Sequence, residues 1–342
     1  MNGFDLSNIS GIYVGSTKYS AIYKGSSLIW PKPHDYSKDY FTIESLEDNN
    51  NIMFYQTGGA NIYIYYSKDK INWTSYSSSW GSEMTTLNNG EKLYIKGNNL
   101  SFNSKNSWVN FSATKSIKVS GNIMSLLYKD DFVGKIDLRN QTYIFYSLFR
   151  QSSTIVDASN LILPAIDLTD SCYECMFYDC ISLVSAPALL ANKTAPYCCQ
   201  NMFYNCTSLV NAPALPATTL DNSCYLGMFG SCTSLVNAPA LPATTLANYC
   251  YKWMFSGCTS LVSAPELPAL TTKTQCYYQM FNNCSRLSYV KAAFTNYVTN
   301  NTYNWLFGVA SNGTFYKNSA ATWTARNVSS VPSDWTIVTY TP

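Results

Sequence analysis

The sequence predicts a multidomain protein in which an antiparallel β-sandwich is followed by an α/β solenoid of 26-residue repeats. Two observations predict the solenoid: Met-Phe pairs recur every 26 residues from Met176 to Met280, and two cysteine series keep the same step. A third, the alternation of apolar and polar residues before residue 140, predicts the sandwich. We expect three parts: a docking segment at 1–34, the sandwich at 35–140, and the solenoid with N- and C-terminal caps at 141–342.

The docking segment contains three short β-like runs separated by Gly/Ser turns. It is too small to hold a core alone, so it is either an extra hairpin on the sandwich or an attachment arm. The pattern Ile-x-Val-Gly-Ser at 12–16, followed by Ile-Tyr-x-Gly-Ser-x-Leu-Ile-Trp-Pro at 22–31, resembles the N-termini of phage virion proteins, including those of phages that infect gut Bacteroidales. That resemblance implies contact with other virion proteins. The candidate attachment residues are Ile22, Tyr23, Leu28, Ile29 and Trp30.

The sandwich is predicted from period-two runs such as Lys92–Lys96, which are bounded by Asn/Gly-rich turns. Within it, Ser67–Trp73 resembles the Asp-box turn, but Ile71 stands at the glycine place and the run is one residue short. We interpret this stretch as a structural hairpin.

Each repeat is expected to combine a short helix with an extended segment. From Cys250 to Cys258 the apolar residues fall at i, i+4, i+5 and i+8, which places them on one arc of a helix. The following Leu261–Ala269 is too rich in proline for a helix interior. Because proline cannot donate to a ladder, the parallel strand should end near the same level in every coil.

The pattern MFxxCxSLxxAPxLP, preceded by CY, resembles the BspA-type (treponemal) leucine-rich repeats over roughly residues 141–342. The resemblance implies a leucine-rich-repeat solenoid. Degenerate copies without cysteines are expected to close the stack. One is Leu148-Phe149, 28 residues before Met176-Phe177, and the other is Leu306-Phe307, 26 residues after Met280-Phe281.

All 12 cysteines lie in the repeats. We expect buried free thiols that behave as small apolar side chains, in preference to disulfides between coils. A metal site is disfavoured because CxxC occurs once, at Cys172 and Cys175, with no histidine beside it.

Composition limits the function further. Charged residues make up 12% of the chain and the net charge is +2, which does not fit a nucleic-acid binder. No apolar run is long enough to cross a membrane, so no membrane insertion is expected. The N-terminus lacks the features of a secretory signal, which favours a route outside the cell such as release in a phage particle.

An enzyme is not expected. The one histidine, His34, lies between Pro33 and Asp35 in a linker and supports no nucleophile–base pair. Glu174 and Glu266 break the repeat pattern, but such changes at repeat surfaces are usually neutral. No catalytic residue, cofactor or metal ligand is therefore assigned.

The outward side of the predicted helices gives the candidate contact residues. They are either ordinary exposed side chains or a surface for protein or sugar. The set is Tyr178, Tyr204, Leu226, Trp253 and Tyr278.

These observations predict a non-enzymatic bacteriophage structural protein on the virion surface, such as a head or tail fibre or decoration protein. It would be anchored by its N-terminus and would bind a host surface protein or glycan through the repeats, with a homo-oligomer such as a trimer as a further possibility. The alternative is a bacterial cell-surface adhesin of the BspA type.

Overall fold

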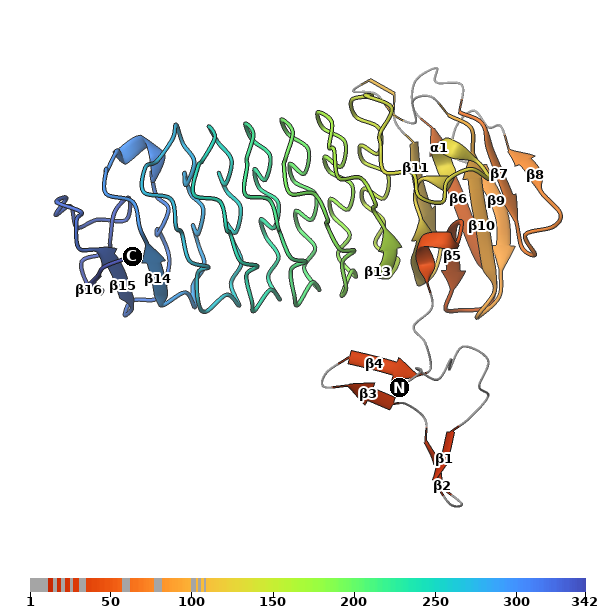
Figure 1. Ribbon diagram of the computed structural model, residues 1–342, viewed down its shortest axis with the longest axis horizontal. Coiled ribbons are helices and arrows are strands. Elements are labelled where there is room, and N and C mark those ends of the chain that lie inside the picture. The colour runs from red at the N-terminus through yellow and green to blue at the C-terminus, as the bar shows by residue number, and fades with distance from the viewer. Residues whose placement is uncertain are drawn as a thin grey trace, which may run out of the picture.

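The computed structural model describes residues 35–56, 62–76, 82–99, 103, 106–107 and 109–342 (Figure 1). Before residue 31 it gives the backbone of four short strands, which pair as two antiparallel hairpins. These strands are β1 (Ile12–Val14), β2 (Thr17–Tyr19), β3 (Ile22–Lys24) and β4 (Ser27–Trp30). The side chains of the candidate attachment residues Ile22, Tyr23, Leu28, Ile29 and Trp30 lie outside the described residues.

Residues 35–162 form two sheets. The larger has the order β13-β12-β5-β10-β7-β8 and the smaller the order β11-β6-β9. The strands of the larger sheet are β5 (Phe41–Ser45), β7 (Ile64–Ser67), β8 (Thr74–Tyr76), β10 (Lys92–Gly97), β12 (Ile117–Asn122) and β13 (Ile155–Ile162). Those of the smaller sheet are β6 (Asn50–Gln56), β9 (Ser82–Leu87) and β11 (Val109–Ala113).

The two sheets pack face to face around aromatic side chains. Phe41 of β5 meets Phe111 of β11 with ring centroids 5.3 Å apart, and Phe111 meets Phe54 of β6 at 4.9 Å. All three are buried because alternate residues of each strand face the other sheet. The 3₁₀ helix η1 (Tyr36–Lys38) precedes the first of these strands, and the short α1 (Ser125–Tyr128) follows β12.

The larger sheet is not purely antiparallel, because β12 pairs in parallel with β13. β13 lies beyond the boundary expected at residue 140, and its Asp157 bridges in parallel to Ser185 of the first strict repeat. Parallel pairing therefore passes from the sheets into the repeats, and one continuous apolar core extends through both.

The predicted α/β leucine-rich-repeat solenoid is wrong. Among the described residues of the repeats there is no α-helix; the segments expected to be helical are runs of turns. The coils lie side by side along the molecule (Figure 1). From Ser171 to Cys180, alternate N–H groups donate to the carbonyl three residues earlier, while the others donate to the next coil, as in Tyr173 to Cys198 at 2.8 Å.

The spacing of the apolar residues explains the wrong prediction. Every fourth residue of these runs has a left-handed backbone, for example Ser171 (φ 55°), Cys175 (φ 55°) and Asp179 (φ 61°). A four-residue repeat buries positions i, i+4 and i+8, the same positions that an amphipathic helix of period 3.6 buries. Over nine residues the two periods cannot be separated by pattern alone. Cys175, which a helix would turn to solvent, is buried.

Proline determines how far each parallel strand extends. The coils with Pro187, Pro213, Pro239 and Pro265 have only isolated parallel bridges on this side, such as Asn211 to Asn237, and no continuous strand. The flanking coils have no proline at that position and form true strands: β13, then β14 (Tyr289–Ala292), which pairs in parallel with β15 (Thr314–Asn318), which pairs with β16 (Thr336–Tyr340). The missing N–H of proline thus limits the ladder, as the sequence predicts.

The interior of the stack consists of columns of equivalent side chains. The phenylalanines of successive Met-Phe pairs stack almost parallel, with Phe203 and Phe229 5.7 Å apart and 4° from parallel. Phe229 is likewise 5.7 Å from Phe255, and all three are fully buried. Each coil therefore covers the apolar surface of its neighbour.

The twelve cysteines are free and buried. One series donates its S–H groups to phenylalanine carbonyls of the preceding coil, as in Cys232 Sγ to Phe203 O at 3.1 Å. Burial raises the pKa of Cys232 to about 12 and acts in the same direction on the other thiols of this series. Cysteine at this position fills a small apolar site and also satisfies a buried carbonyl.

The degenerate copies close the stack in different ways. Upstream, Phe149 stacks on Phe177 at 5.0 Å, which confirms that copy. Downstream, the expected pair Leu306-Phe307 is wrong by one residue. Trp305 and Leu306 are buried, whereas Phe307 is 48% exposed. Phe281 N–H bonds to Trp305, so that coil is one residue short; η2 (Thr299–Asn301) lies within it.

Candidate partner-contact surface

The five candidate contact residues lie on the turn side of the coils, but they do not form one continuous row. Tyr178, Tyr204, Leu226 and Tyr278 are half-buried, and Trp253 is 39% exposed. Ring contacts gather them into two groups, one around Tyr178 and Tyr204 and the other around Trp253 and Tyr278. Leu226 has no ring contact with either group among the described residues.

In the first group, Tyr178 and Tyr204 stack with centroids 5.1 Å apart, and the Arg150 guanidinium lies 4.8 Å from the Tyr178 ring centre. The Tyr204 ring covers Gly230 of the next coil, where a Cβ atom would come within 2.8 Å of the ring. The stack ends there because Gly230 continues the column with no side chain.

We call the second group the Lys252 cluster: Tyr249, Lys252, Trp253, Tyr278 and Tyr303. Lys252 Nζ lies 4.5 Å from the Trp253 ring centre, 4.6 Å from that of Tyr278 and 5.5 Å from that of Tyr249. Tyr278 stacks on Tyr303 at 5.2 Å. The cluster thus places one cation beside three aromatic rings, and a fourth ring stacks on one of them.

Two glutamine side chains orient the Lys252 cluster. Lys252 Nζ donates to Gln275 Oε1 at 2.7 Å, and Trp253 Nε1 donates to Gln279 Oε1 at 2.6 Å. Partial burial lowers the pKa of Lys252, and no other cause contributes. Sequence reasoning missed Tyr249, which precedes the helix predicted from Cys250, and Tyr303, which lies in the degenerate copy after the strict repeats.

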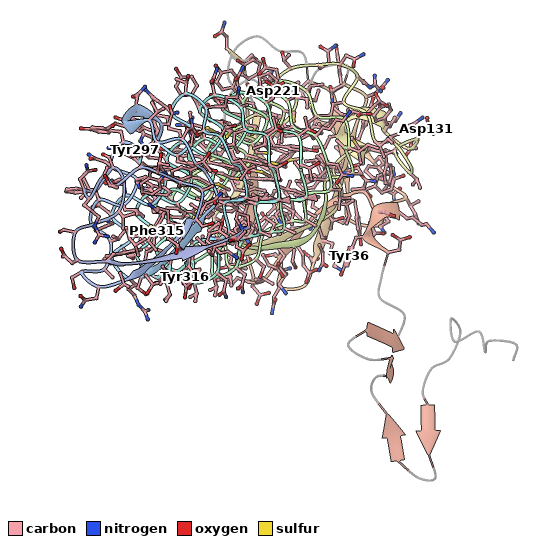
Figure 2. The ribbon with its side chains drawn as sticks, turned by 60° about the vertical axis from the view of Figure 1, so that its left-hand side comes forward. Tyr36, Asp131, Asp221, Tyr297, Phe315 and Tyr316 are labelled. Atoms are coloured by element: carbon pink, nitrogen blue, oxygen red, sulfur yellow. The ribbon has the colours of Figure 1, made fainter. Side chains whose placement is uncertain are left out.

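The larger sheet offers a second polar region, on the face turned away from the smaller sheet. A pocket of about 300 Å³ there is lined by Tyr36, Asp39, Thr42, Lys70, Lys92, Tyr94 and Ser120. Tyr36 belongs to η1, where the chain leaves the N-terminal strands (Figure 2). Both lysines already have acidic partners: Lys70 pairs with Asp39 at 3.5 Å and Lys92 with Glu44 at 3.3 Å.

Beside this pocket, Lys96 is also neutralised within the chain. Its Nζ pairs with Asp130 at 2.7 Å and lies 3.8 Å from the Trp73 ring centre. Tyr40 donates to the same carboxylate at 2.6 Å, and burial together with Asp130 raises the pKa of Tyr40 to about 12.

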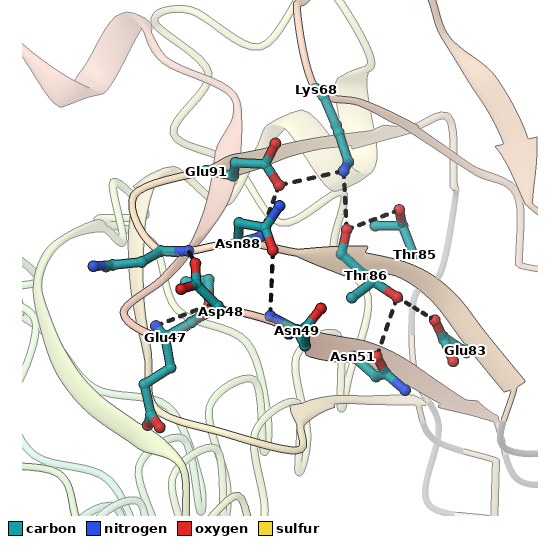
Figure 3. Close-up of polar contacts among 12 residues, drawn as sticks. Glu47, Asp48, Asn49, Asn51, Lys68, Glu83, Thr85, Thr86, Asn88 and Glu91 are labelled. Carbon is teal, nitrogen blue, oxygen red and sulfur yellow. Dashed lines mark hydrogen bonds and ion pairs between the residues drawn. The ribbon is translucent and has the colours of Figure 1, made fainter.

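Polar residues at the hairpin ends hold the loops in place (Figure 3). Lys68 Nζ donates to Thr86 O at 2.9 Å and pairs with Glu91 at 3.5 Å, and the N–H of Asn88 donates to Glu91 at 2.7 Å. In the neighbouring turn, Asp69 accepts from the N–H groups of Ile71 and Asn72, both at 2.8 Å. Those backbone hydrogen bonds lower the pKa of Asp69, so the ionised carboxylate stabilises this hairpin.

The two carboxylates weighed for catalysis lie in different coils. Glu174 accepts from Gln200 at 3.0 Å, and Glu266 pairs with Lys291 at 2.8 Å. Within the described residues, no three His, Cys, Asp or Glu side chains are placed to hold a metal ion. In that same part of the chain, no helix is long and apolar enough to span a bilayer.

No family model, no curated protein and no solved structure matches this chain.

Proposed function

We propose that this chain is a non-enzymatic structural protein of a bacteriophage particle, anchored through residues 1–34 and contacting a host surface through the turn side of its coils. The pattern of the N-terminal segment supports the particle assignment. The contact role is supported by the aromatic groups on the stack.

One observation carries the contact role: Trp253 is held at the surface by neighbouring coils, and the residue is 39% exposed. It contacts Tyr278 at 6.3 Å and is fixed by the hydrogen bond to Gln279. A rigid, exposed tryptophan loses little entropy on binding and covers a large apolar area, as expected at the centre of a contact surface.

The experiment combines Tyr204→Ser with Trp253→Ser, one change in each aromatic group. The double variant should keep the thermal melting profile of the unmodified protein, apart from a small loss of stacking on Tyr178. It should lose most of its binding to host cells. Full binding by a folded double variant would refute the contact role.

The matched control is Val210→Ser with Val236→Ser. Both valines are exposed, at 39% and 42%, and precede the single bridges between coils, so they lie on the strand side. This control should bind cells normally. If it loses binding while the aromatic double variant does not, the contact surface lies on the strand side.

A further inference from the structure

The Lys252 cluster lies at positions that differ from coil to coil. The pairs equivalent to Lys252-Trp253 in the other strict coils are Glu174-Cys175, Gln200-Asn201, Leu226-Gly227 and Tyr278-Gln279. By contrast, the block Thr207–Leu220 recurs without change at Thr233–Leu246. Among the strict coils, this is the one that places a cation beside an indole at these positions.

The backbone conformation at Trp253 and Tyr249 is unfavourable for large side chains. Trp253 has φ 58° and Tyr249 has φ 59°, both in the left-handed region that bulky side chains rarely adopt. The positions equivalent to Trp253 in the two preceding coils hold Asn201 and Gly227, residues that tolerate this conformation. Positive φ recurs at the position of Trp253 in the other strict coils, at Cys175, Asn201, Gly227 and Gln279, so it belongs to the turn repeat. What is local to this coil is the large indole placed at such a position, where it is held at the surface.

The charge of Lys252 is not neutralised in the way that the charges of Lys96 and Lys291 are. Lys96 and Lys291 pair with Asp130 and Glu266, each through a short ion pair. In the part of the chain that the structure describes, Lys252 has no carboxylate partner; its Nζ has Gln275 and three aromatic rings. A partly desolvated cation without an acid is suited to an anionic group from outside the chain.

We propose that the Lys252 cluster binds an acidic saccharide, with a sugar carboxylate on Lys252 and a pyranose ring against Trp253. This proposal rests on the proposed function and names the ligand of that surface. The C–H face of a sugar packs on an exposed indole, while amides such as Gln275 and Gln279 offer hydrogen bonds to hydroxyls. The same chemistry occurs in uronic-acid polymers and in sialylated glycans.

The direct test is calorimetric titration of the whole chain with short galacturonate oligomers, sialyl-lactose and neutral galactose oligomers. We expect binding to one or both acidic probes and at least tenfold weaker binding to the neutral one. Which acidic probe binds more tightly identifies the source. Binding should also weaken as salt is raised. Equal binding to neutral and acidic probes, or no binding to either acidic probe, would overturn the proposal.

Three variants test whether binding of the acidic probes depends on this site, on positive charge in general or on correct folding. Lys252→Gln removes the charge and should weaken acidic-probe binding about tenfold. Lys193→Gln, at an exposed lysine on another coil, should bind as the unmodified protein does. Trp253→Asn introduces the residue found at Asn201; it should abolish binding and leave the melting temperature equal or higher, because the left-handed strain is relieved. Retained binding by Trp253→Asn, or equal losses in the two lysine variants, would contradict a specific site.

Failure of this inference can be told apart from failure of the proposed function. If cell binding is lost in Tyr204→Ser/Trp253→Ser but acidic probes do not compete for it, the surface contacts a different partner and the acidic-saccharide assignment is wrong. If that double variant still binds cells, the contact role itself is wrong.

Discussion

Raising the pH should unfold this protein unusually early, because its core is rich in protonated thiols. Eleven of the twelve cysteines have a raised pKa, through burial in ten and chiefly through the neighbouring Cys198 in Cys199. In the unfolded chain these thiols return to a pKa of about 8.5. Above that pH the unfolded state binds fewer protons than the folded state, so the free energy of unfolding falls as pH rises.

The size of the effect follows from the number of thiols. At pH 9.5 each thiol that stays protonated in the fold lowers the free energy of unfolding by about 1.4 kcal/mol. Eleven of them lower it by about 15 kcal/mol, as much as the whole stability of a typical domain. Below about pH 7.5 the contribution is nearly constant. The loss sets in as the pH passes about 8.5 and grows until the pH approaches the raised pKa of the folded thiols, about 12 for Cys232.

Urea titrations at pH 7, 8, 9 and 9.5, with a reductant to prevent disulfide formation, would measure this dependence. A triple variant, Cys206→Ala, Cys232→Ala and Cys258→Ala, is the control. It should be less stable at pH 7 but should lose about 4 kcal/mol less per pH unit above pH 8.5. If the unmodified protein loses less than about 3 kcal/mol between pH 8 and 9.5, the thiols are not buried in protonated form.

The remaining predictions concern single elements. Phe229→Ala removes a ring that stacks on Phe203 and Phe255, and should lower the free energy of unfolding by about 3–5 kcal/mol in urea titrations; a loss below about 1 kcal/mol would mean that the column is not packed. Asp69→Ala should lower the melting temperature at pH 7. The difference should begin to shrink as the pH falls below about 4, where the unfolded chain takes up the proton, and should be lost only as the pH falls through the lowered pKa of Asp69 in the fold. An equal loss at pH 2.5 would show that the charge is irrelevant. Deletion of residues 1–33 should leave melting of the remainder unchanged and abolish incorporation into particles; an insoluble product would instead place that segment in the core.

The sequence predicts the interior of the stack better than its backbone. The inward positions of the unit from Cys250 to Cys258 are buried, as periodicity predicts, because stacking requires the same apolar side chain at every step. Their conformation was predicted wrongly, since a four-residue turn repeat and a helix bury the same positions. The proline limit on the strand was predictable because it depends on one missing N–H group.

The Lys252 cluster shows why the candidate site could be predicted only in part. Trp253 and Tyr278 were predictable as outward residues, but their association with Tyr249 and Tyr303 depends on left-handed turns and on a final coil that is one residue short. Neither feature has a clear sequence signal, because Tyr249 and Trp253 are not residues that favour positive φ.

The alternation of hydrogen bonds along each turn run also gives the stack a dipole along its long axis. In the turn runs of the strict coils, the N–H groups that leave the coil point toward the C-terminal end, and the carbonyls that receive them point back, as from Phe177 to Met202 and from Phe203 to Met228. Aligned peptide dipoles add, as they do in a helix, but here the positive pole lies at the C-terminal end of the stack. The end farthest from the two sheets should therefore attract anions, even though the chain as a whole is nearly neutral.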